Sequence, residues 1–460
     1  MPFGGGGIKL EIIIVGCGKV GSAIAKRLSE EGHNITVIDK NAEKVNHLTE
    51  EIDVMGMVGN GSSIDTLMEA GLERAEVVIA VTGSDELNML CCMFAKKNST
   101  CHTIARVRNP EYIDELDFIK DQLNISAIIN PELAAAREIA LLLFHPAALK
   151  IDAFAEGRAQ LIKIELPKDS PMSGKQLKDI GKIISCDMLV CAVERNGNVT
   201  IPRGDFVFED GDIISFLATP EQANTFFERL HLPYKQVKNA LIVGGSTLGF
   251  YLAKSLLERH IDVRIVEQDI AKCEELAVEL PKVTVIHGDG ADRQLLMAEG
   301  LQETEAMVAL TSIDEENILL SLYAKKHSSA KLITKVNRLE FDDITDGLDI
   351  GSVIYPKYIT SDSIVQYVRA LRNAAGNNVK TLYRILDDRV EALEFDVSDK
   401  SNVTDIPLSQ LKLKNNLLIC CIDRGGKIII PRGSDTIQVG DAVIVVTLEQ
   451  GLHDLSDILK

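Results

Sequence analysis

The chain has 460 residues, enough for about three to four domains of ordinary size. Apolar residues make up 46% and charged residues 25% of it, as in folded globular proteins. Its formal net charge of −19 argues against a nucleic-acid partner, because phosphate backbones are bound by clustered lysine and arginine. A small anion is not excluded, since the N-terminus of a helix can bind one locally.

Neither a membrane helix nor a secretory signal is expected. The longest apolar run, at residues 140–144, falls far short of the ~20 residues that a spanning helix needs. The start, MPFGGGG, is expected to be a disordered or foreign extension, with the natural start close to Lys9. The nine cysteines show no framework spacing, and the adjacent pairs at 91–92 and 420–421 are expected in the core. These features favour a protein of the reducing cytosol.

The first third of the chain alternates between predicted strands and helices. The apolar spacing of residues 22–32 predicts a helix that ends at Gly32. Buried strands are predicted at residues 11–16, 35–39, 54–59, 77–82, 103–107 and 127–130. Strands separated by helices predict an α/β domain with a doubly wound parallel sheet, of the Rossmann type.

A different pattern follows the strong helix predicted at residues 132–143. Short strands are predicted at residues 158–166, 187–195, 199–204 and 211–218. Tight turns are expected at Asn196–Gly197 and Gly211–Asp212. The motif IPRG should place its glycine, Gly204, in the left-handed conformation. This segment is predicted to be a small α+β module rich in strands.

The whole pattern recurs about 229 residues later, which predicts two copies of one unit. IIIVGCGKVG at 12–21 matches ALIVGGSTLG at 240–249, VTGSDELN at 81–88 matches LTSIDEEN at 310–317, and IPRG at 201–204 recurs at 430–433. We expect doubly wound domains with a linker helix at 8–150 and 234–378, and small modules at 151–233 and 379–460. A linker near residues 231–239 should join the two halves.

The first copy contains an unbroken GxGxxG between a strand and a helix. Gly16 would permit the tight turn, Gly18 the approach of a pyrophosphate, and Gly21 close packing of the helix on the strand. The helix that begins near Lys19 would direct free N–H groups at the phosphates. Asp39 would accept hydrogen bonds from ribose hydroxyls and repel a 2′-phosphate, which favours NAD(H) over NADP(H). The alternative is a glycine-rich turn kept only for packing.

The second copy departs from this motif. It has Gly244 and Gly249, but Ser246 replaces the middle glycine and adds a Cβ where a pyrophosphate would come closest. Glu267 keeps the acid. This copy either binds a nucleotide, weakly or of a different kind from the first copy, or it is a degenerate site retained only for the architecture.

Further loops at the carboxyl ends of the strands should line the pocket, because ligands of open α/β sheets bind there. In the first copy these are Asn60–Gly61, Thr82–Gly83 and Arg106, and in the second Thr311–Ser312 and Lys335. Arg106 is equally compatible with a phosphate partner and with an ordinary surface salt bridge. The acidic runs SDE and IDEE are interpreted as helix caps with acids in the first turn.

No catalytic set can be inferred. The histidines do not recur between the copies, and no zinc, CxxC or P-loop spacing occurs. The small module is itself duplicated, which does not suit a substrate domain. Arg203 and Arg432 of the IPRG motifs are more simply exposed or turn-stabilising than ligand-facing. The sequence therefore indicates ligand binding without visible chemistry.

GCGKVG with Asp39, VTGSDELNML, ARVRNP and IPRGD followed by GD together resemble the TrkA family, the cytosolic regulatory subunits of Trk-type potassium uptake systems. Its members carry Rossmann-like RCK (KTN) domains, each followed by a TrkA-C domain. The resemblance implies a homotetrameric ring at the inner face of the membrane, bound to an integral-membrane potassium channel subunit. It also implies NAD(H) binding and, in many members, a response to ATP or ADP. Some relatives bind a cyclic dinucleotide at the C-terminal modules, which this sequence does not decide.

The family's site residues can be carried over one by one. The first site comprises Gly16, Cys17, Gly18, Lys19, Val20, Gly21, Asp39, Asn60, Gly61, Thr82, Gly83 and Arg106. The second comprises Gly244, Gly245, Ser246, Thr247, Leu248, Glu267, Thr311, Ser312 and Lys335. The leading hypothesis is a regulatory protein in which nucleotide binding biases one of two ring shapes. The alternatives are an NAD-dependent oxidoreductase with unrecognised catalytic residues and a structural scaffold with vestigial sites.

Overall fold

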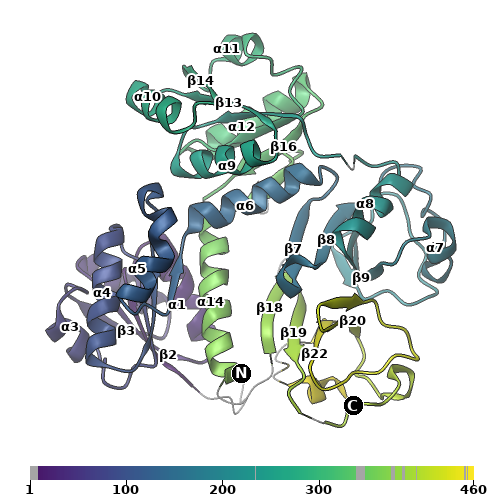
Figure 1. Ribbon diagram of the computed structural model, residues 1–460, viewed down its shortest axis with the longest axis horizontal. Coiled ribbons are helices and arrows are strands. Elements are labelled where there is room, and N and C mark those ends of the chain that lie inside the picture. The colour runs from purple at the N-terminus through teal and green to yellow at the C-terminus, as the bar shows by residue number, and fades with distance from the viewer. Residues whose placement is uncertain are drawn as a thin grey trace. The chain divides into compact units, whose positions relative to one another are not determined.

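The computed structural model describes residues 9–233, 235–337, 348–374, 379–385, 389–399, 401–449, 452 and 454–460. It divides into two compact units, each built from equivalent parts of both sequence halves (Figure 1). The first unit runs to Ala140 and includes Lys238–Val368, and the second contains Leu141–Val237 and Arg369–Lys460. The MPFGGGG extension and the predicted domain limits at residues 8, 234 and 378 lie outside the described residues.

The first doubly wound domain has a fully parallel six-stranded sheet of order β3-β2-β1-β4-β5-β6. This is the predicted fold, and the order reverses between β1 and β4, where such sheets bind ligands. Its elements are β1 (Glu11–Val15), α1 (Lys19–Glu30), β2 (Asn34–Asp39), α2 (Ala42–Glu51), β3 (Met55–Val58), α3 (Ile64–Glu69), β4 (Val77–Ala80), α4 (Asp85–Asn98), β5 (His102–Arg106), η1 (Pro110–Glu115), α5 (Leu116–Gln122), β6 (Ala127–Ile129) and α6 (Pro131–Phe144).

The central strands explain why this sheet could be read from sequence. Residues of β1 from Ile12 to Val15 and all of β4 are at most 2% exposed, since helices cover both faces. A parallel strand buried on both faces must be apolar throughout, which gives continuous rather than alternating runs. Cys91, Cys92 and Cys101 pack in the same core, which confirms the interpretation of the adjacent pair.

The second doubly wound domain repeats this topology, in the order β14-β13-β12-β15-β16-β17. All of its strand pairs are parallel. Its elements are β12 (Asn239–Val243), α9 (Thr247–Glu258), β13 (Asp262–Glu267), α10 (Ile270–Glu279), β14 (Thr284–His287), α11 (Arg293–Ala298), β15 (Ala306–Ala309), α12 (Asp314–His327), β16 (Lys331–Lys335), β17 (Ser352–Ile354) and α14 (Pro356–Ala374).

Each of the two small modules has its own antiparallel five-stranded sheet. The strand order is β10-β9-β11-β8-β7 in the first module and β21-β20-β22-β19-β18 in the second. The first contains β7 (Lys150–Phe154), η2 (Ala155–Gly157), β8 (Ala159–Glu165), α7 (Leu177–Ile184), β9 (Leu189–Arg195), β10 (Asn198–Thr200), β11 (Ile213–Ala218) and α8 (Pro220–Arg229). The second contains β18 (Val379–Ile385), β19 (Val390–Asp396), η3 (Leu408–Gln410), β20 (Leu417–Arg424), β21 (Lys427–Ile429), β22 (Asp441–Thr447) and η4 (Leu455–Ile458). The α+β class is confirmed, although β7 was not predicted.

The prediction for the IPRG glycine was wrong. Neither Gly204 nor Gly433 has a positive φ, whereas Gly211 of the GD turn has φ 81° as expected. The IPRG carbonyls instead accept hydrogen bonds from the N–H groups of Lys178 and Ser409, at 3.0 and 2.9 Å. A Cβ on Gly433 would lie 3.2 Å from the Cβ of Ser409. A side chain at Gly433 would thus crowd a neighbouring segment, whereas one at Gly204 would lie 3.5 Å from the Cβ of Lys178, an ordinary contact.

The two small modules are joined by a common core and by reciprocal ion pairs. Cys191 and Cys420 belong to one buried cluster with apolar residues of both modules. Arg158 contacts Asp423 at 2.6 Å, and Arg389 contacts Glu194 at 2.6 Å. Each arginine directly precedes an equivalent strand, β8 or β19, so the contacts follow the internal repeat. The second unit is thus a pseudo-symmetric pair of modules.

Within the first unit, α14 packs on the first doubly wound domain, although it belongs to the second half of the sequence (Figure 1). Asp362 of α14 forms an ion pair with Arg27 of α1. Tyr367 of α14 hydrogen-bonds Ser126, next to β6. This packing of α14 was not predicted from the sequence, because it depends on contacts between residues far apart in the chain.

Candidate nucleotide-binding site

The loop between β1 and α1 has the backbone that a phosphate site requires. Gly16 has φ +109°, which favours glycine strongly. A Cβ on Gly21 would overlap the carbonyl oxygen of Gly16, so this glycine allows α1 to pack closely. A Cβ on Gly18 would meet nothing within 4 Å, and no side chain caps the helix there. The N–H groups at the start of α1 therefore face open space.

Asp39 at the end of β2 anchors this loop. One carboxylate oxygen accepts a hydrogen bond from the Cys17 N–H at 2.7 Å, and the other from the Asn41 N–H at 2.9 Å. The acid predicted to bind a ribose thus also fixes the glycine turn. The Cys17 side chain is buried, and burial above all raises the pKa of its thiol to about 12. Cys17 therefore stays a neutral packing residue at physiological pH.

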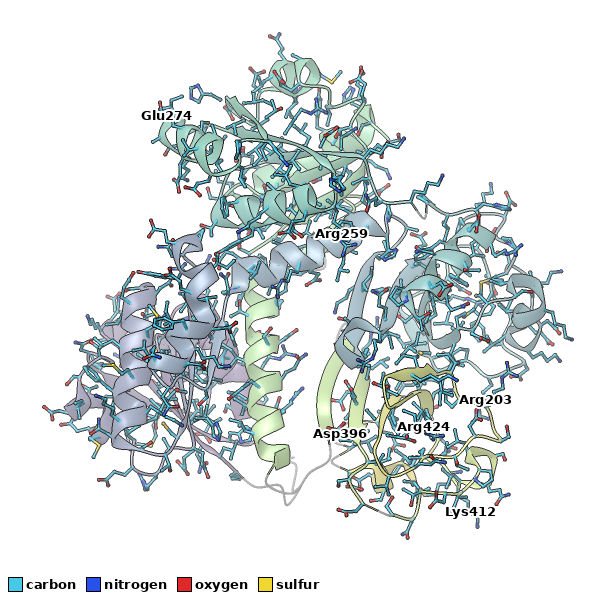
Figure 2. The ribbon with its side chains drawn as sticks, in the orientation of Figure 1. Arg203, Arg259, Glu274, Asp396, Lys412 and Arg424 are labelled. Atoms are coloured by element: carbon cyan, nitrogen blue, oxygen red, sulfur yellow. The ribbon has the colours of Figure 1, made fainter. Side chains whose placement is uncertain are left out.

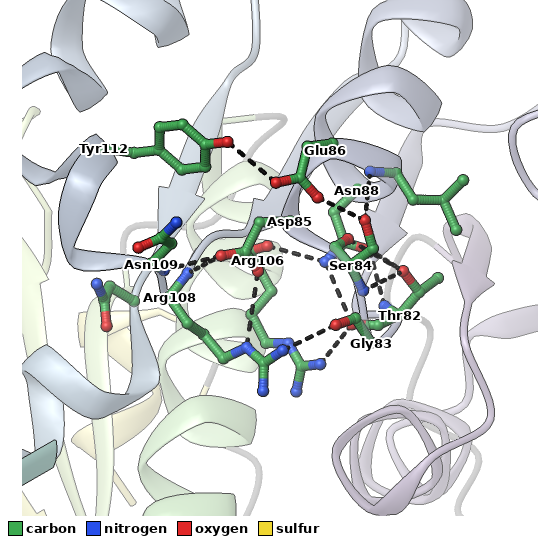
Figure 3. Close-up of polar contacts among 12 residues, drawn as sticks. Thr82, Gly83, Ser84, Asp85, Glu86, Asn88, Arg106, Arg108, Asn109 and Tyr112 are labelled. Carbon is green, nitrogen blue, oxygen red and sulfur yellow. Dashed lines mark hydrogen bonds and ion pairs between the residues drawn. The ribbon is translucent and has the colours of Figure 1, made fainter. Parts of the chain in front are cut away.

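Asn88 in α4 joins the ends of β4 and β5, a role that the sequence analysis missed. Its side-chain oxygen accepts from the Thr82 N–H at 2.8 Å and from the Thr82 hydroxyl at 2.7 Å (Figure 3). Its amide donates to the Arg106 carbonyl at 2.8 Å. Asn317 makes the matching contacts with the Thr311 N–H at 2.8 Å and the Lys335 carbonyl at 3.0 Å. The sequence did contain a sign of this role, because VTGSDELN and LTSIDEEN both end in asparagine at the equivalent position.

Asp85 does more than the predicted first-turn acid of a capped helix. Ser84 caps α4 by accepting from the Leu87 N–H, as predicted. Asp85, however, is only 7% exposed and accepts from the N–H groups of Arg108 and Asn109, at 2.7 and 2.8 Å. It thereby fixes the segment that follows β5, which contains Arg108 and adjoins Arg106 at the end of the strand.

The guanidinium groups of Arg106 and Arg108 lie side by side next to the end of β4 (Figure 3). Arg106 donates to the Thr82 carbonyl, and Arg108 donates to the Gly83 carbonyl at 2.9 Å. Burial, followed by the charge of Arg108, lowers the pKa of Arg106. Arg106 is thus a half-buried cation tied to the strand end rather than a residue of a surface salt bridge. Two adjacent cations create a place where an anion would be stabilised.

These elements surround a cavity of about 640 Å³ at the carboxyl edge of the first sheet, within the size range of small-molecule sites. Nine predicted residues line it: Gly16, Gly18, Lys19, Val20, Asp39, Gly61, Thr82, Gly83 and Arg106. Cys17, Gly21 and Asn60 are not among the lining residues and support the surrounding loops. Arg108, Glu132, Asn337, Lys357 and Thr360 also line it and were not predicted.

The equivalent loop of the second copy is partly closed by its own side chain. Gly244 keeps the strained turn with φ +110°. Ser246, however, caps α9, with its hydroxyl 3.5 Å from the Gly249 N–H. Thr247 and Leu248 form the first turn of that helix. The hydroxyl therefore stands where the open N–H groups of the first copy would meet a phosphate.

The remaining predicted residues of the second copy keep the scaffold of the first. Glu267 accepts from the Gly245 N–H at 2.7 Å and the Asp269 N–H at 2.9 Å, as Asp39 does in its own loop. Lys335 donates to the Leu310 carbonyl at 3.0 Å, and burial lowers its pKa. Ser312 is exposed in the loop after β15.

Two further predictions concern the arginines of the IPRG motifs and membrane-spanning helices. Arg203 is exposed on its module (Figure 2). The side chain of Arg432 is 83% exposed, so both arginines are exposed as predicted. Over the described ranges, no helix is both long enough and apolar enough to cross a bilayer.

Family models match both types of domain twice. The TrkA-N domain model matches residues 12–131 and 240–356, and the TrkA-C domain model matches residues 161–231 and 392–460. The chain belongs to the TrkA family. The Trk system potassium uptake protein TrkA homolog 1 of Methanosarcina mazei is 32% identical over 459 residues, which cover 98% of this chain and 100% of the relative. The TrkA protein of Halomonas elongata is 31% identical over 96% of both chains.

The TrkA repeats also have solved structural neighbours. The structure titled GsuK channel bound to NAD has a TM-score of 0.62 and 17% sequence identity, and the match covers 96% of this chain and 77% of that one. The GsuK RCK domain matches with a TM-score of 0.61 and 17% identity, over 95% of this chain and 92% of that one. At this identity the likeness shows a common fold.

Proposed function

We propose that this chain is the cytosolic regulatory subunit of a Trk-type potassium uptake system. In this proposal, binding of NAD(H) or adenine nucleotides gates potassium transport through a membrane channel subunit. The observation that carries the proposal is the cavity beside Gly18 and Asp39, in a chain of the TrkA family. Two relatives that match this chain over 98% and 96% of its length are named as TrkA proteins of the Trk potassium uptake system.

The first TrkA-N repeat would bind the nucleotide in the orientation common to Rossmann folds. The pyrophosphate would accept hydrogen bonds from the N–H groups at the start of α1, whose dipole favours negative charge. Asp39 would accept from the ribose hydroxyls while it continues to hold the Cys17 N–H. Its charge would disfavour a 2′-phosphate, so NAD(H) should bind more tightly than NADP(H).

The two repeats would be functionally unequal. In the second, the Ser246 hydroxyl competes with a phosphate for the N–H groups of α9. We therefore assign the main sensing role to the first repeat, and to the second a weaker or different nucleotide. The proposed site residues are those carried over above, and the proposed domain limits are 8–150, 151–233, 234–378 and 379–460.

The role proposed is regulatory rather than enzymatic. The ionisable residues that line the cavity are Asp39, Glu132, lysines and arginines. The lysines and arginines suit anion binding, and both oxygens of Asp39 accept backbone hydrogen bonds. An NAD-dependent oxidoreductase remains the alternative that the experiment below must exclude.

Gating would act through the helices that leave the nucleotide-binding unit. Helix α6 passes from the first unit into the second at Ala140, and α14 does so at Val368. A nucleotide that binds one conformation of the first unit more tightly would shift the equilibrium of a homotetrameric ring by its difference in affinity. That ring would bind the channel subunit at the inner face of the membrane.

Calorimetric titration of NADH, NAD, ATP and ADP tests this function, with the absorbance of the nicotinamide followed in the same samples. We expect saturable binding of at least one nucleotide and no change in NADH absorbance. Absence of any nucleotide binding would refute the proposal, and NADH consumption would favour the oxidoreductase.

A further inference from the structure

One wall of the first cavity comes from the second half of the chain. Asn337, which follows β16, and Lys357, in the first turn of α14, both line the cavity. Thr360 of the same helix also lines it and is fully buried. The wall stays in place because α14 is bound to the first domain through the contacts of Asp362 and Tyr367. Residues of both sequence halves therefore line this cavity.

The order of the strands fixes the direction in which a nucleotide would lie. Asp39 stands at the end of β2, the glycine loop at the end of the neighbouring β1, and Thr82 just after the next strand, β4. Adjacent strands are ~4.8 Å apart. The guanidinium groups of Arg106 and Arg108 reach back to carbonyls just after β4, one strand spacing beyond the glycine loop. A phosphate chain that starts at α1 and runs away from the ribose therefore leads to these cations.

Arg106 and Arg108 give this part of the cavity two cations, beside the acids Glu132 and Asp85. The Nε of Arg106 is buried and has no hydrogen-bond partner in the described part of the chain. A nicotinamide nucleoside, which would occupy this end in a dinucleotide, carries no negative charge. A third phosphate would instead be bound by the two arginines and by a further cation that lines the cavity.

Lys357 is a further cation that lines this cavity, and its position follows from the internal repeat. One residue lies between the end of β6 and Pro131–Glu132, and one residue lies between the end of β17 and Pro356–Lys357. Both pairs line this one cavity, so α6 contributes an acid and α14 contributes a base. The 19-residue helix α14 also begins here, and its N-terminus favours an anion.

We propose that Lys357 binds the terminal phosphate of a nucleoside triphosphate held in the first site, which the second half of the chain thereby completes. The inference rests on the proposed function, and it names the ligand class and the residue that distinguishes a triphosphate from a dinucleotide. A bound triphosphate would bridge α1 and α14, and so hold α14 against the first domain. A nucleoside monophosphate would bind without this bridge.

Titration of the full-length protein and its Lys357→Gln variant with ATP, AMP and NADH tests the proposal. One lost charge-assisted hydrogen bond should weaken ATP binding by about tenfold or more and change AMP and NADH binding by less than about twofold. Lys357→Arg should retain most of the ATP affinity. Lys44→Gln removes the same charge near Asp39 and should lower the three affinities about equally, which makes it the matched control.

Hydrogen exchange supplies a second measurement that a purely structural lysine would not change. ATP should slow amide exchange in residues 356–368 of the unmodified protein, AMP should not, and Lys357→Gln should abolish the effect of ATP. If the unmodified protein binds ATP but Lys357→Gln lowers all three affinities equally, or none, this inference is wrong while the proposed function stands. If the unmodified protein binds no nucleotide, both fail.

Discussion

Gly18→Ser should separate nucleotide binding from folding. Gly18 has φ −77° and ψ −177°, which any residue can adopt, and an added Cβ would meet nothing within 4 Å. The new hydroxyl would cap α1 by accepting from the Gly21 N–H, as Ser246 does in the second copy. Serine and glycine at this position differ by only a few tenths of a kcal/mol in helix stability. The free energy of unfolding should therefore change little.

Nucleotide affinity should fall sharply in the same variant. The hydroxyl would occupy N–H groups that otherwise donate to phosphate, and each such charge-assisted hydrogen bond contributes about 1.5–3 kcal/mol. The loss of one corresponds to a decrease of about 10- to 150-fold in affinity. Calorimetry for binding and denaturant titration for stability measure the two effects separately.

Two further variants test the same reasoning at the second site and at a glycine that folding requires. Ser246→Gly should strengthen or broaden binding at the second site with little change in stability, since it removes only the cap of α9. Gly21→Ser should instead prevent correct folding, because its Cβ would overlap the Gly16 carbonyl oxygen. Unchanged nucleotide affinity in a folded Gly18→Ser protein would refute the reasoning about the open N-terminus of α1.

Three other results are expected. NADH should bind more tightly than NADPH, and Asp39→Asn should reduce that preference; equal affinities in the unmodified protein would contradict the role of the Asp39 charge. NADH absorbance should stay constant with a panel of keto acids and aldehydes, and turnover of any one would favour an enzyme. Burial lowers the pKa of Lys331 from 10.5 to about 8, so its charge destabilises the folded state below pH 8 and this penalty disappears as the pH rises towards 10.5. Lys331→Met should thus change the free energy of unfolding more favourably at neutral pH than at pH 10; an equal change at both pH values would exclude this cause.

The features predictable from sequence were those set by local geometry. Strands such as β1 and β4 appear as unbroken apolar runs because both faces are buried. Gly16 and Gly21 were assigned correct roles because a tight turn and close helix packing each exclude a side chain. Because the sequence contains each domain type twice, the two types could be recognised more clearly than from a single copy.

The features that escaped prediction depend on contacts between distant residues. Asp85 had the appearance of a helix-capping acid, and only the fold brings the N–H groups after β5 within its reach. Lys357 has no motif of its own, and it joins the first cavity because α14 packs on the domain of the other half. Gly433 was misjudged because a close approach to Ser409 leaves no local signature.

Potassium flux gives the most direct test of the central claim that nucleotide binding at the first repeat gates transport. The cognate channel subunit would be reconstituted in liposomes with the unmodified protein or with Gly18→Ser, and flux measured with and without ATP, ADP and NADH. The account predicts a nucleotide-dependent flux with the unmodified protein and a greatly reduced dependence with Gly18→Ser. A flux that does not change with any nucleotide, or that changes equally with the unmodified protein and with Gly18→Ser, would contradict it.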